Sequence, residues 1–445
     1  MFSQVTTPLP HREGQGVGLF SLQQLKDSAL QNNIAIRNAQ YSIDAAQQQR
    51  KEAFTKYFPN VSGTGLWFNA NKGMAQTELN LSEQISPELG MALAQSLPAE
   101  ALAALGNPIS VSMMKNGTIA GINAVQPVFA GGQIINGNKL AKVGEEVCRL
   151  QLQLSENEVE KQTEQYFWQL VSLQEKMKTI EAVQALLTDI YKDVDVAVRA
   201  GVAMRNDLLQ VQLRQNDVES QKLKLQNGIN IVRLLLAQYC GLHNDSFSVE
   251  SLVFNDDSSI PVVKQDWDQA LLRTIEYKLL NKQVEATKLQ CKMEIGKNLP
   301  TVGVGTGYNY HNLLDNDHSF AMVFTTVSVP ISDWWGGSHA IKRKKIAQQQ
   351  AEEQLADNSQ LLKIRMQNAW NNVGESRQQL QIAQRGIEQA EENLRLNRDY
   401  YRAGTSKMSD LLEAQLLYQQ SLNHRTDAYA DYQNKLLEYR QATGQ

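Results

Sequence analysis

Hydrophobic and polar positions follow two different periods along this chain. From Val302 to Tyr310, apolar or aromatic residues alternate with glycines and polar residues, which is the period-two pattern of a strand with two unlike faces. From about Ala340 to Tyr401 the pattern is helical and contains no proline. A helix of that length would extend for about 90 Å at 1.5 Å per residue, which no compact domain needs. The pattern therefore predicts short strands combined with very long helices.

A seven-residue repeat marks a narrow seam on this long helix. Its large residues alternate with small ones, and the rest of the surface is rich in Gln, Glu and Arg. The seam residues are Val373, Leu380, Ile387, Leu394 and Tyr401, with Ala383 and Ala390 between them. Such a seam predicts a helix that packs along its edges and is otherwise in water. A second long helix, at about 142–198, keeps the seam in part, through Leu170, Met177, Ile180, Leu187 and Tyr191.

Two strand hairpins are bracketed by prolines. A helical stretch from Leu19 to Phe58 ends before the first hairpin, at about 59–127, because the residue before a proline disfavours the helix. A stretch from Asp266 to Leu299 ends before the second, at about 300–330. The alternation in the second hairpin suits membrane-crossing strands and equally a half-buried hairpin of a soluble sheet.

The first hairpin carries a loop insertion at about 72–117. Ser86–Glu88 and Gly106 are start and stop signals for one or two short helices within it. Each hairpin then closes with a glycine pair, Gly131–Gly132 or Gly336–Gly337, which we expect to form a sharp turn into the following helix.

The same order of elements occurs twice, which indicates a tandem duplication. Gly201 and Gly404 occupy equivalent turns between two helices, at an offset of 203 positions. Residues identical at that offset are Arg199, Ala200, Gly201, Asp207, Leu208, Leu209, Gln212 and Leu213. We predict a flexible leader at 1–18, a first repeat at 19–245, a connector at 246–263 and a second repeat at 264–445. The leader lacks the basic and apolar segments of a secretory signal.

Composition excludes several classes of function. The net charge is −4, and no basic patch with interleaved aromatics indicates nucleic-acid binding. There is no run of 18 or more apolar residues, as a membrane-spanning helix would need. The three cysteines lack metal-site or disulfide spacing. The six histidines form no catalytic motif, and His311 and His318, which flank a turn, read as surface residues. The sequence thus predicts no enzyme activity, cofactor or metal site.

The ordered combination of motifs resembles the TolC-like outer-membrane efflux protein family (outer membrane factors). The motifs that carry the resemblance are Tyr57–Val61, Gln126–Gly132, Trp335–Gly337, Tyr401–Thr405 and Asp410–Ala414. The resemblance implies an α+β membrane protein with an internal duplication. It implies a homotrimer with an outer-membrane β-barrel, four strands per protomer and twelve in all, continuous with a long periplasmic α-helical barrel.

Function and partners are also implied by this resemblance. The family exports substrates across the outer membrane, in efflux or type I secretion, and works with a periplasmic adaptor (membrane fusion) protein and an inner-membrane transporter of RND or ABC type. The resemblance also implies that the β-barrel contacts the lipid of the outer membrane. The substrate, the pump and the adaptor stay open. The alternative is a soluble coiled-coil scaffold without transport activity, which the leader and the seam favour but the two strand hairpins do not explain.

Family positions suggest candidate site residues. Asp410 and Glu413 match the acidic rings of the periplasmic gate, and Tyr401 and Asp207 match its closing network. The family arginine two positions after the turn glycine is Ser406 here, so Lys407, Arg402 or Arg205 would have to replace it. A first-turn helix acid is the simpler role for Asp410. The tip turns expected to contact the adaptor are Arg199, Ala200, Gly201, Arg402, Ala403 and Gly404. Trp334 and Trp335 suit a bilayer–water boundary or ordinary core packing.

Overall fold

The structure is a computed structural model of the chain. It describes residues 18–72, 75–79, 109–113, 115–242, 247–250, 263–313, 317–331 and 333–445, with residues 86, 91 and 98. Two compact units can be separated within it. The helical unit comprises residues 1–47, 143–285 and 349–445, and the sheet unit comprises residues 48–142 and 286–348.

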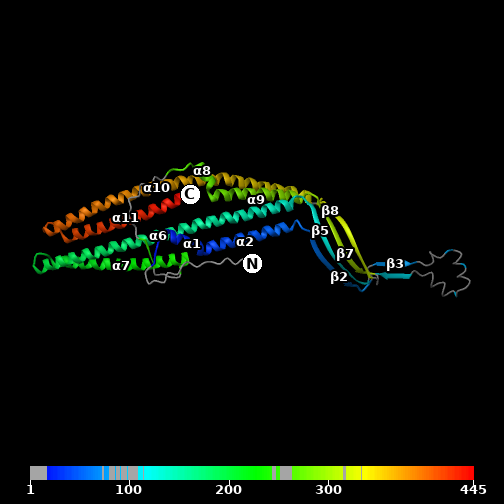
Figure 1. Ribbon diagram of the computed structural model, residues 1–445, viewed down its shortest axis with the longest axis horizontal. Helices are drawn as coiled ribbons and strands as arrows, with labels where there is room; N and C mark the ends of the chain where they lie inside the picture. The colour runs from blue at the N-terminus through cyan, green and yellow to red at the C-terminus, as the bar shows by residue number, and fades with distance from the viewer. Residues whose placement is uncertain are drawn as a thin grey trace. The chain divides into compact units, whose positions relative to one another are not determined.

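Helices account for most of the described residues (Figure 1). They are α1 (Leu22–Asn32), α2 (Ile34–Thr55), α6 (Gln133–Arg199), α7 (Arg205–Cys240), α8 (Trp267–Arg273), α9 (Ile275–Lys297), α10 (Asp333–Arg402) and α11 (Met408–Ala442). The strands are β1 (Gly18–Phe20), β2 (Asn60–Asn69), β3 (Ala75–Leu79), β4 (Ile109–Met113), β5 (Asn116–Ala130), β6 (Phe247–Val249), β7 (Thr301–Asn312) and β8 (Asp317–Ser328). The α+β fold class and the two very long helices are confirmed.

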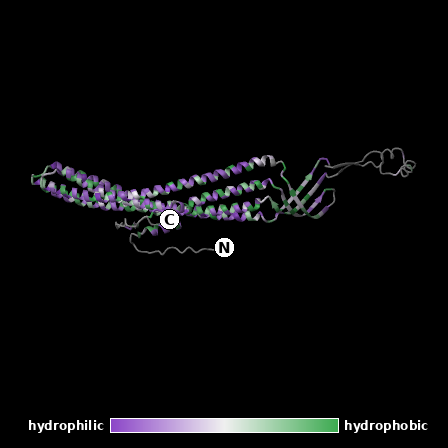
Figure 2. Ribbon diagram, turned by 90° about the horizontal axis from the view of Figure 1, so that it is seen from above, coloured by the Kyte–Doolittle hydropathy of each residue, from purple (hydrophilic) through white to green (hydrophobic). Residues whose placement is uncertain are grey.

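The seam predicted on α10 is the buried side of that helix. Val373, Ala383, Ile387 and Ala390 are buried, and Tyr401 packs beside them at the end of the seam. On α6 the corresponding buried residues include Leu170, Ile180 and Leu187. Hydrophilic residues predominate elsewhere along the helices (Figure 2). The helices therefore pack through narrow apolar lines, as the heptad spacing predicts.

The helical stretches before each hairpin are broken, which corrects the expectation of one continuous helix in each repeat. Asn33 and Thr274 have extended backbone conformations between α1 and α2 and between α8 and α9. Asn33 Oδ1 accepts from Ala35 N–H at 2.8 Å, and its Nδ2 donates to the Tyr239 carbonyl at 3.1 Å. Side chains that bond to nearby backbone compete with the helix. The two breaks are at equivalent places in the two repeats.

The four long strands form one antiparallel sheet in the order β2–β5–β7–β8. The central contact joins the two repeats, because β5 of the first pairs with β7 of the second. Strands β2 and β8 are the edges of this sheet within one chain. Unpaired edge strands expose a row of backbone donors and acceptors that can pair with another chain.

The two faces of the sheet differ in composition. One face, here called the apolar face, carries Val61, Trp67, Ile122, Val304, Tyr308, Val323 and Val327, which the strand registers place on the same side. These side chains are open to the surroundings; Trp67 is 70% exposed and Val323 80% exposed. The opposite face holds the glycines of β7, of which Gly303, Gly305 and Gly307 are buried. The predicted alternation along β7 is confirmed.

The two glycine pairs do not have the same role, and one expectation was wrong. Gly131 and Gly132 have positive φ values of 58° and 75° and form the predicted turn from β5 into α6. Gly336 and Gly337 lie inside α10, which begins at Asp333. A Cβ at Gly337 would lie 1.8 Å from Asn298 Oδ1, so close packing rather than a turn explains a glycine there.

Gly131 also approaches the end of α9 closely. A Cβ at Gly131 would lie 2.1 Å from the carbonyl oxygen of Gly296, and a Cβ at Gly296 would lie 2.3 Å from that of Gly131. Both overlaps are with backbone carbonyl oxygens, and rotation of a side chain cannot relieve them. This pair of glycines brings the start of α6 and the end of α9 into backbone contact.

Two short pairings were not predicted. β1 pairs in parallel with β6, so part of the expected connector at 246–263 is a strand. β3 and β4 form an antiparallel pair at the base of the insertion. The short helices expected between Ser86 and Gly106 fall on residues that, apart from Ser86, Met91 and Pro98, lie outside the described ranges, as does most of the leader.

Candidate functional site

The turns at Gly201 and Gly404 share one backbone structure. Their φ values are 74° and 72°, a conformation that residues with a Cβ rarely adopt. In each turn the glycine N–H donates to the carbonyl three residues earlier, and the next N–H donates to the carbonyl five residues earlier. This pair of bonds is the Schellman ending of a helix. Both turns lie at the same end of the helical unit (Figure 1).

Asp207 and Asp410 each stabilise the start of the helix that follows. Asp207 Oδ2 accepts from the Met204 N–H at 3.3 Å, and Asp410 Oδ2 accepts from the Lys407 N–H at 3.2 Å. A carboxylate in the first turn also interacts favourably with the helix dipole. The simpler role considered for Asp410 is therefore present, and it leaves the residue exposed.

Glu413 lies one turn further along α11. Its side chain is exposed, and within the described ranges its carboxylate has no hydrogen bond or ion pair. Unlike Asp410, it therefore has no structural role within one chain that would explain an acid at this position.

Tyr401 and Asp207, from different repeats, both line the hollow at the tips. Tyr401 packs against an apolar cluster that includes Ile190, Val194 and Leu411. The pKa of its phenol is raised, first by burial and then by the negative charge of Asp207. The carboxylate of Asp207 in the first hairpin thus acts electrostatically on Tyr401 in the second.

An ion pair joins the two hairpins at their tips. Arg402 Nη2 lies 3.3 Å from Asp193 Oδ2, where Arg402 ends α10 and Asp193 belongs to the last turns of α6. Ser406, at the position of the family arginine, instead donates its hydroxyl to Lys407 O at 3.3 Å. Lys407 itself precedes the first turn of α11. Of the three cations considered, Arg402 is the one that bridges the hairpins.

The tips differ in side-chain chemistry. Val202 and Met204 after the first turn are 80% and 74% exposed, whereas Thr405, Ser406 and Lys407 follow the second. Ala200 and Ala403 are both exposed, and Arg199 pairs with Asp195 on its own helix at 2.7 Å. A hollow of about 1070 Å³ lies between the tips, and Asp193, Asp207, Tyr401, Arg402 and Ser409 are among its lining residues.

A buried polar network further up the hairpins escaped the sequence analysis. Arg214 of α7 donates to Gln415 Oε1 at 3.0 Å and to Gln419 Oε1 at 2.7 Å, both on α11. Gln419 in turn donates to Gln221 at 2.9 Å. Both α11 glutamines are buried, and burial lowers the pKa of Arg214. The only signal in the sequence is that Gln212 and Gln415 are equivalent repeat positions, and this does not reveal a partner.

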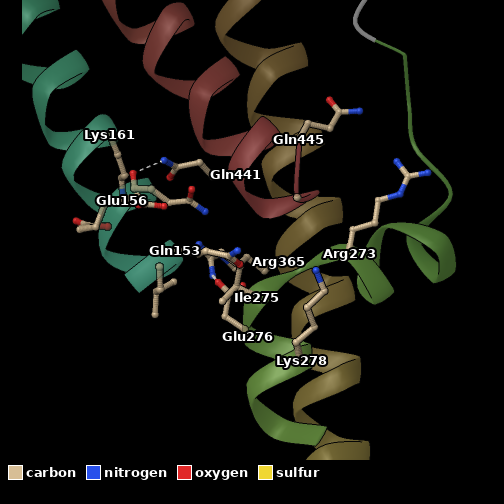
Figure 3. A pocket seen from close by; sticks show the side chains of 14 residues that line it. Gln153, Glu156, Lys161, Arg273, Ile275, Glu276, Lys278, Arg365, Gln441 and Gln445 are labelled. Carbon is tan, nitrogen blue, oxygen red and sulfur yellow. Dashed lines mark hydrogen bonds and ion pairs between the residues drawn. The ribbon is translucent and has the colours of Figure 1, made fainter. Parts of the chain in front are cut away.

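A second hollow, of about 330 Å³, occurs elsewhere in the helical unit, between α6, α9, α10 and the end of α11 (Figure 3). Gln441 Nε2 donates to the Asn157 carbonyl at 2.7 Å, and Arg365 pairs with Glu276 at 3.1 Å. Its lining mixes acidic and basic side chains. Because the Gln441–Asn157 bond connects the two repeats, we interpret the hollow as part of a structural joint.

The candidate interface aromatics give a partial result. Trp335 is largely exposed, so it does not pack into the core of a single chain. The side chain of Trp334 lies outside the described part of the structure. None of the helices in the described ranges has the length and apolar character of a membrane span.

Comparisons with known proteins point in one direction. Residues 268–445 match the family model for outer membrane efflux proteins, which confirms the resemblance inferred from the motifs. No curated protein sequence matches the chain.

Three solved structures share the fold of all or nearly all of the chain. CusC has a TM-score of 0.78 and 16% identity, with 100% of this chain and 98% of that chain covered. The outer membrane protein VceC of Vibrio cholerae has a TM-score of 0.73 and 14% identity, with 95% and 96% covered. The outer membrane channel CmeC of Campylobacter jejuni has a TM-score of 0.75 and 14% identity, with 95% and 85% covered.

Proposed function

We propose, since residues 268–445 belong to the outer membrane efflux protein family and the whole chain has the fold of outer-membrane channels, that this protein is a trimeric export channel of the outer membrane. Its tunnel would extend through the periplasm. The function is transport of substrates rather than catalysis.

The observation that carries this proposal is the four-stranded sheet. Its apolar face is exposed, and among the described residues its edge strands β2 and β8 have no strand partner on their outer sides. One chain cannot close such a sheet, whereas three chains joined edge to edge would close one of twelve strands and leave no free edge. The apolar face would then contact lipid, and the glycine-rich face would line the pore. A soluble scaffold would leave this apolar face in water.

The hairpin tips are proposed as the periplasmic gate. Threefold symmetry would bring three copies each of Asp410 and Glu413 around one axis, where rings of carboxylates attract cations. The Arg402–Asp193 ion pair would hold the two hairpins of each chain together in the closed state. Arg402 would thereby replace the family arginine that is missing at Ser406.

The partners follow from the same assignment. We infer that the tip turns around Gly201 and Gly404 contact a periplasmic adaptor protein, which connects the channel to an inner-membrane transporter of RND or ABC type. These turns are exposed and rigid, because each is fixed by its Schellman bonds and by a carboxylate at the following helix start.

Channel formation tests the proposed function directly. Full-length protein purified in detergent should migrate as a heat-resistant trimer and give discrete, long-lived conductance steps when added to a planar lipid bilayer. A mock preparation from cells that lack the gene is the control. Protein that remains monomeric in aqueous buffer without detergent and gives no conductance would instead support the scaffold.

A proline at the second tip should separate docking from assembly. Gly404→Pro removes the N–H that donates to Tyr401 O at 3.0 Å and cannot adopt a positive φ. We expect adaptor binding to weaken by about tenfold or more because the turn must change shape. The trimer should persist, because this turn is remote in sequence from the sheet. Binding is measured by surface plasmon resonance with the periplasmic adaptor protein that co-purifies with the native channel.

The matched control is Gly404→Asn, since asparagine tolerates the left-handed conformation better than other residues. It should bind the adaptor nearly as the native protein does. Loss of the trimer in Gly404→Pro would show that the turn serves folding instead of docking.

A further inference from the structure

Two histidines face each other near the end of the β7–β8 hairpin. His311 of β7 and His318 of β8 are direct partners in the antiparallel register, so their side chains lie on the same face of the sheet. The centroids of their imidazole rings are 5.4 Å apart, and the ring planes are inclined by 41°. From the sequence, both residues read as separate surface residues beside a turn.

This separation matches two imidazoles on a single metal ion. A histidine nitrogen binds Zn²⁺ at about 2.0–2.1 Å, and two imidazoles bound to one tetrahedral ion at that length have ring centroids about 5 Å apart. The 5.4 Å separation of the two rings is close to that value, so both side chains lie within reach of one shared ion. The strand register holds the two backbones in place before any ion arrives.

One nitrogen of the pair needs a partner. His311 Nδ1 is buried, and it accepts or donates no hydrogen bond within the described residues. Leaving a buried polar atom without a partner costs free energy. A metal ion bound to this nitrogen, or a water molecule bound to such an ion, would remove that cost. Phe320 covers one side of the site, 6.1 Å and 6.2 Å from the two rings.

The neighbouring acid is not part of the site. Asp317 Oδ1 accepts from Tyr310 and from Asn312, both at 2.7 Å, and the register places all three on the opposite face from the histidines. In the described ranges no three or more His, Cys, Asp or Glu side chains form a group that could hold a metal. Each chain thus offers two protein ligands, and the other positions would belong to water.

We propose that His311 and His318 form a binding site for a divalent first-row transition-metal ion such as Cu²⁺, Ni²⁺ or Zn²⁺. Imidazole ligands favour these ions over Mg²⁺ and Ca²⁺, which prefer oxygen. The proposal does not depend on channel activity, because both ligands come from one chain. It assigns a role to a pair of residues that the export function leaves unused.

Copper binding tests the site. The full-length chain, purified without a histidine tag, is titrated with Cu²⁺ and followed by electron paramagnetic resonance, in which nitrogen ligands split the copper signal. We expect one copper ion per chain with two nitrogen ligands. His311→Asn and His318→Asn should each weaken binding by about 100-fold, because the second imidazole then no longer binds intramolecularly. His424→Asn in α11 is the matched control and should bind as the native chain does.

Several results would overturn the site. These are no copper signal with nitrogen splitting in the native chain, or equal binding in all three variants. If the His311 and His318 variants fail to fold, the native chain decides the question. Bound Zn²⁺ should protect both histidines from diethyl pyrocarbonate, as mapped by mass spectrometry, but leave His424 reactive. Equal modification of the pair with and without Zn²⁺ would contradict the proposal.

Discussion

Channels in which Asp410 and Glu413 are both replaced by alanine should lose most of their preference for cations. In the proposed trimer the double substitution removes two carboxylates from each of three chains at the narrow end of the tunnel. Charges gathered in a confined opening set a potential of several kT, so the ratio of cation to anion permeability should fall by about tenfold in dilute salt. The permeability ratio is measured from the reversal potential of the channel in a planar bilayer under a salt gradient. Block by multivalent cations should weaken in parallel.

Replacing Asp410 by alanine removes a helix-capping hydrogen bond as well as a charge, so a second variant is needed that removes the charge alone. Asp410 accepts a hydrogen bond from the Lys407 N–H, and loss of a helix cap costs about 1 kcal/mol. Asp410→Asn with Glu413→Gln keeps an acceptor oxygen and removes only the charge, so it should reproduce the alanine result. Asp217→Asn, on the exposed side of α7, is the control. Unchanged ion selectivity in both double variants would exclude an acidic ring at these positions.

Gly131→Ala should prevent normal assembly of the protein. The added Cβ would lie 2.1 Å from the backbone oxygen of Gly296, at a residue whose φ is 58°. Neither the backbone strain nor the overlap can be relieved by rotating a side chain, so we expect a loss of more than about 3 kcal/mol of stability. Gly296→Ala should have a similar effect, because its Cβ would meet the carbonyl of Gly131. The yield of heat-resistant trimer and thermal unfolding followed by circular dichroism report the loss.

Gly144→Ala is the matched control for that substitution. Gly144 lies inside α6, and a Cβ there would meet nothing within 4 Å among the described residues. Alanine in a helix interior is favoured over glycine by about 1 kcal/mol, so this variant should be as stable as the native protein or more stable. Equal trimer yields from Gly131→Ala and Gly144→Ala would show that the contact with Gly296 is not required.

Local periodicity predicted the elements of this fold well. The heptad positions from Val373 to Tyr401 are the packed side of α10, because a helix with so few apolar residues has one way to bury them. The alternation along β7 predicted its two faces for the same reason. The turn at Gly404 was recognisable because a positive φ restricts the choice of residue.

Contacts between distant segments were less predictable. The helix break at Asn33 depends on a hydrogen bond to the Tyr239 carbonyl, more than two hundred positions away. No local sequence pattern predicts this break. The Arg402–Asp193 ion pair and the bonds of Arg214 with the glutamines of α11 arise in the same way, from hairpins that meet only after folding. Gly337 misled because a glycine required by a close neighbour looks the same in a sequence as one required by a turn.

The unlike tips have a consequence for whatever docks on them. A ring of three such chains would present six turns with the same backbone shape. Three of them would carry the exposed hydrophobic residues Val202 and Met204, and the three between them the hydrophilic residues Thr405 and Lys407. Six identical adaptor subunits would therefore meet two kinds of landing site. Each subunit would need a contact surface tolerant of both, or only every second position would bind tightly.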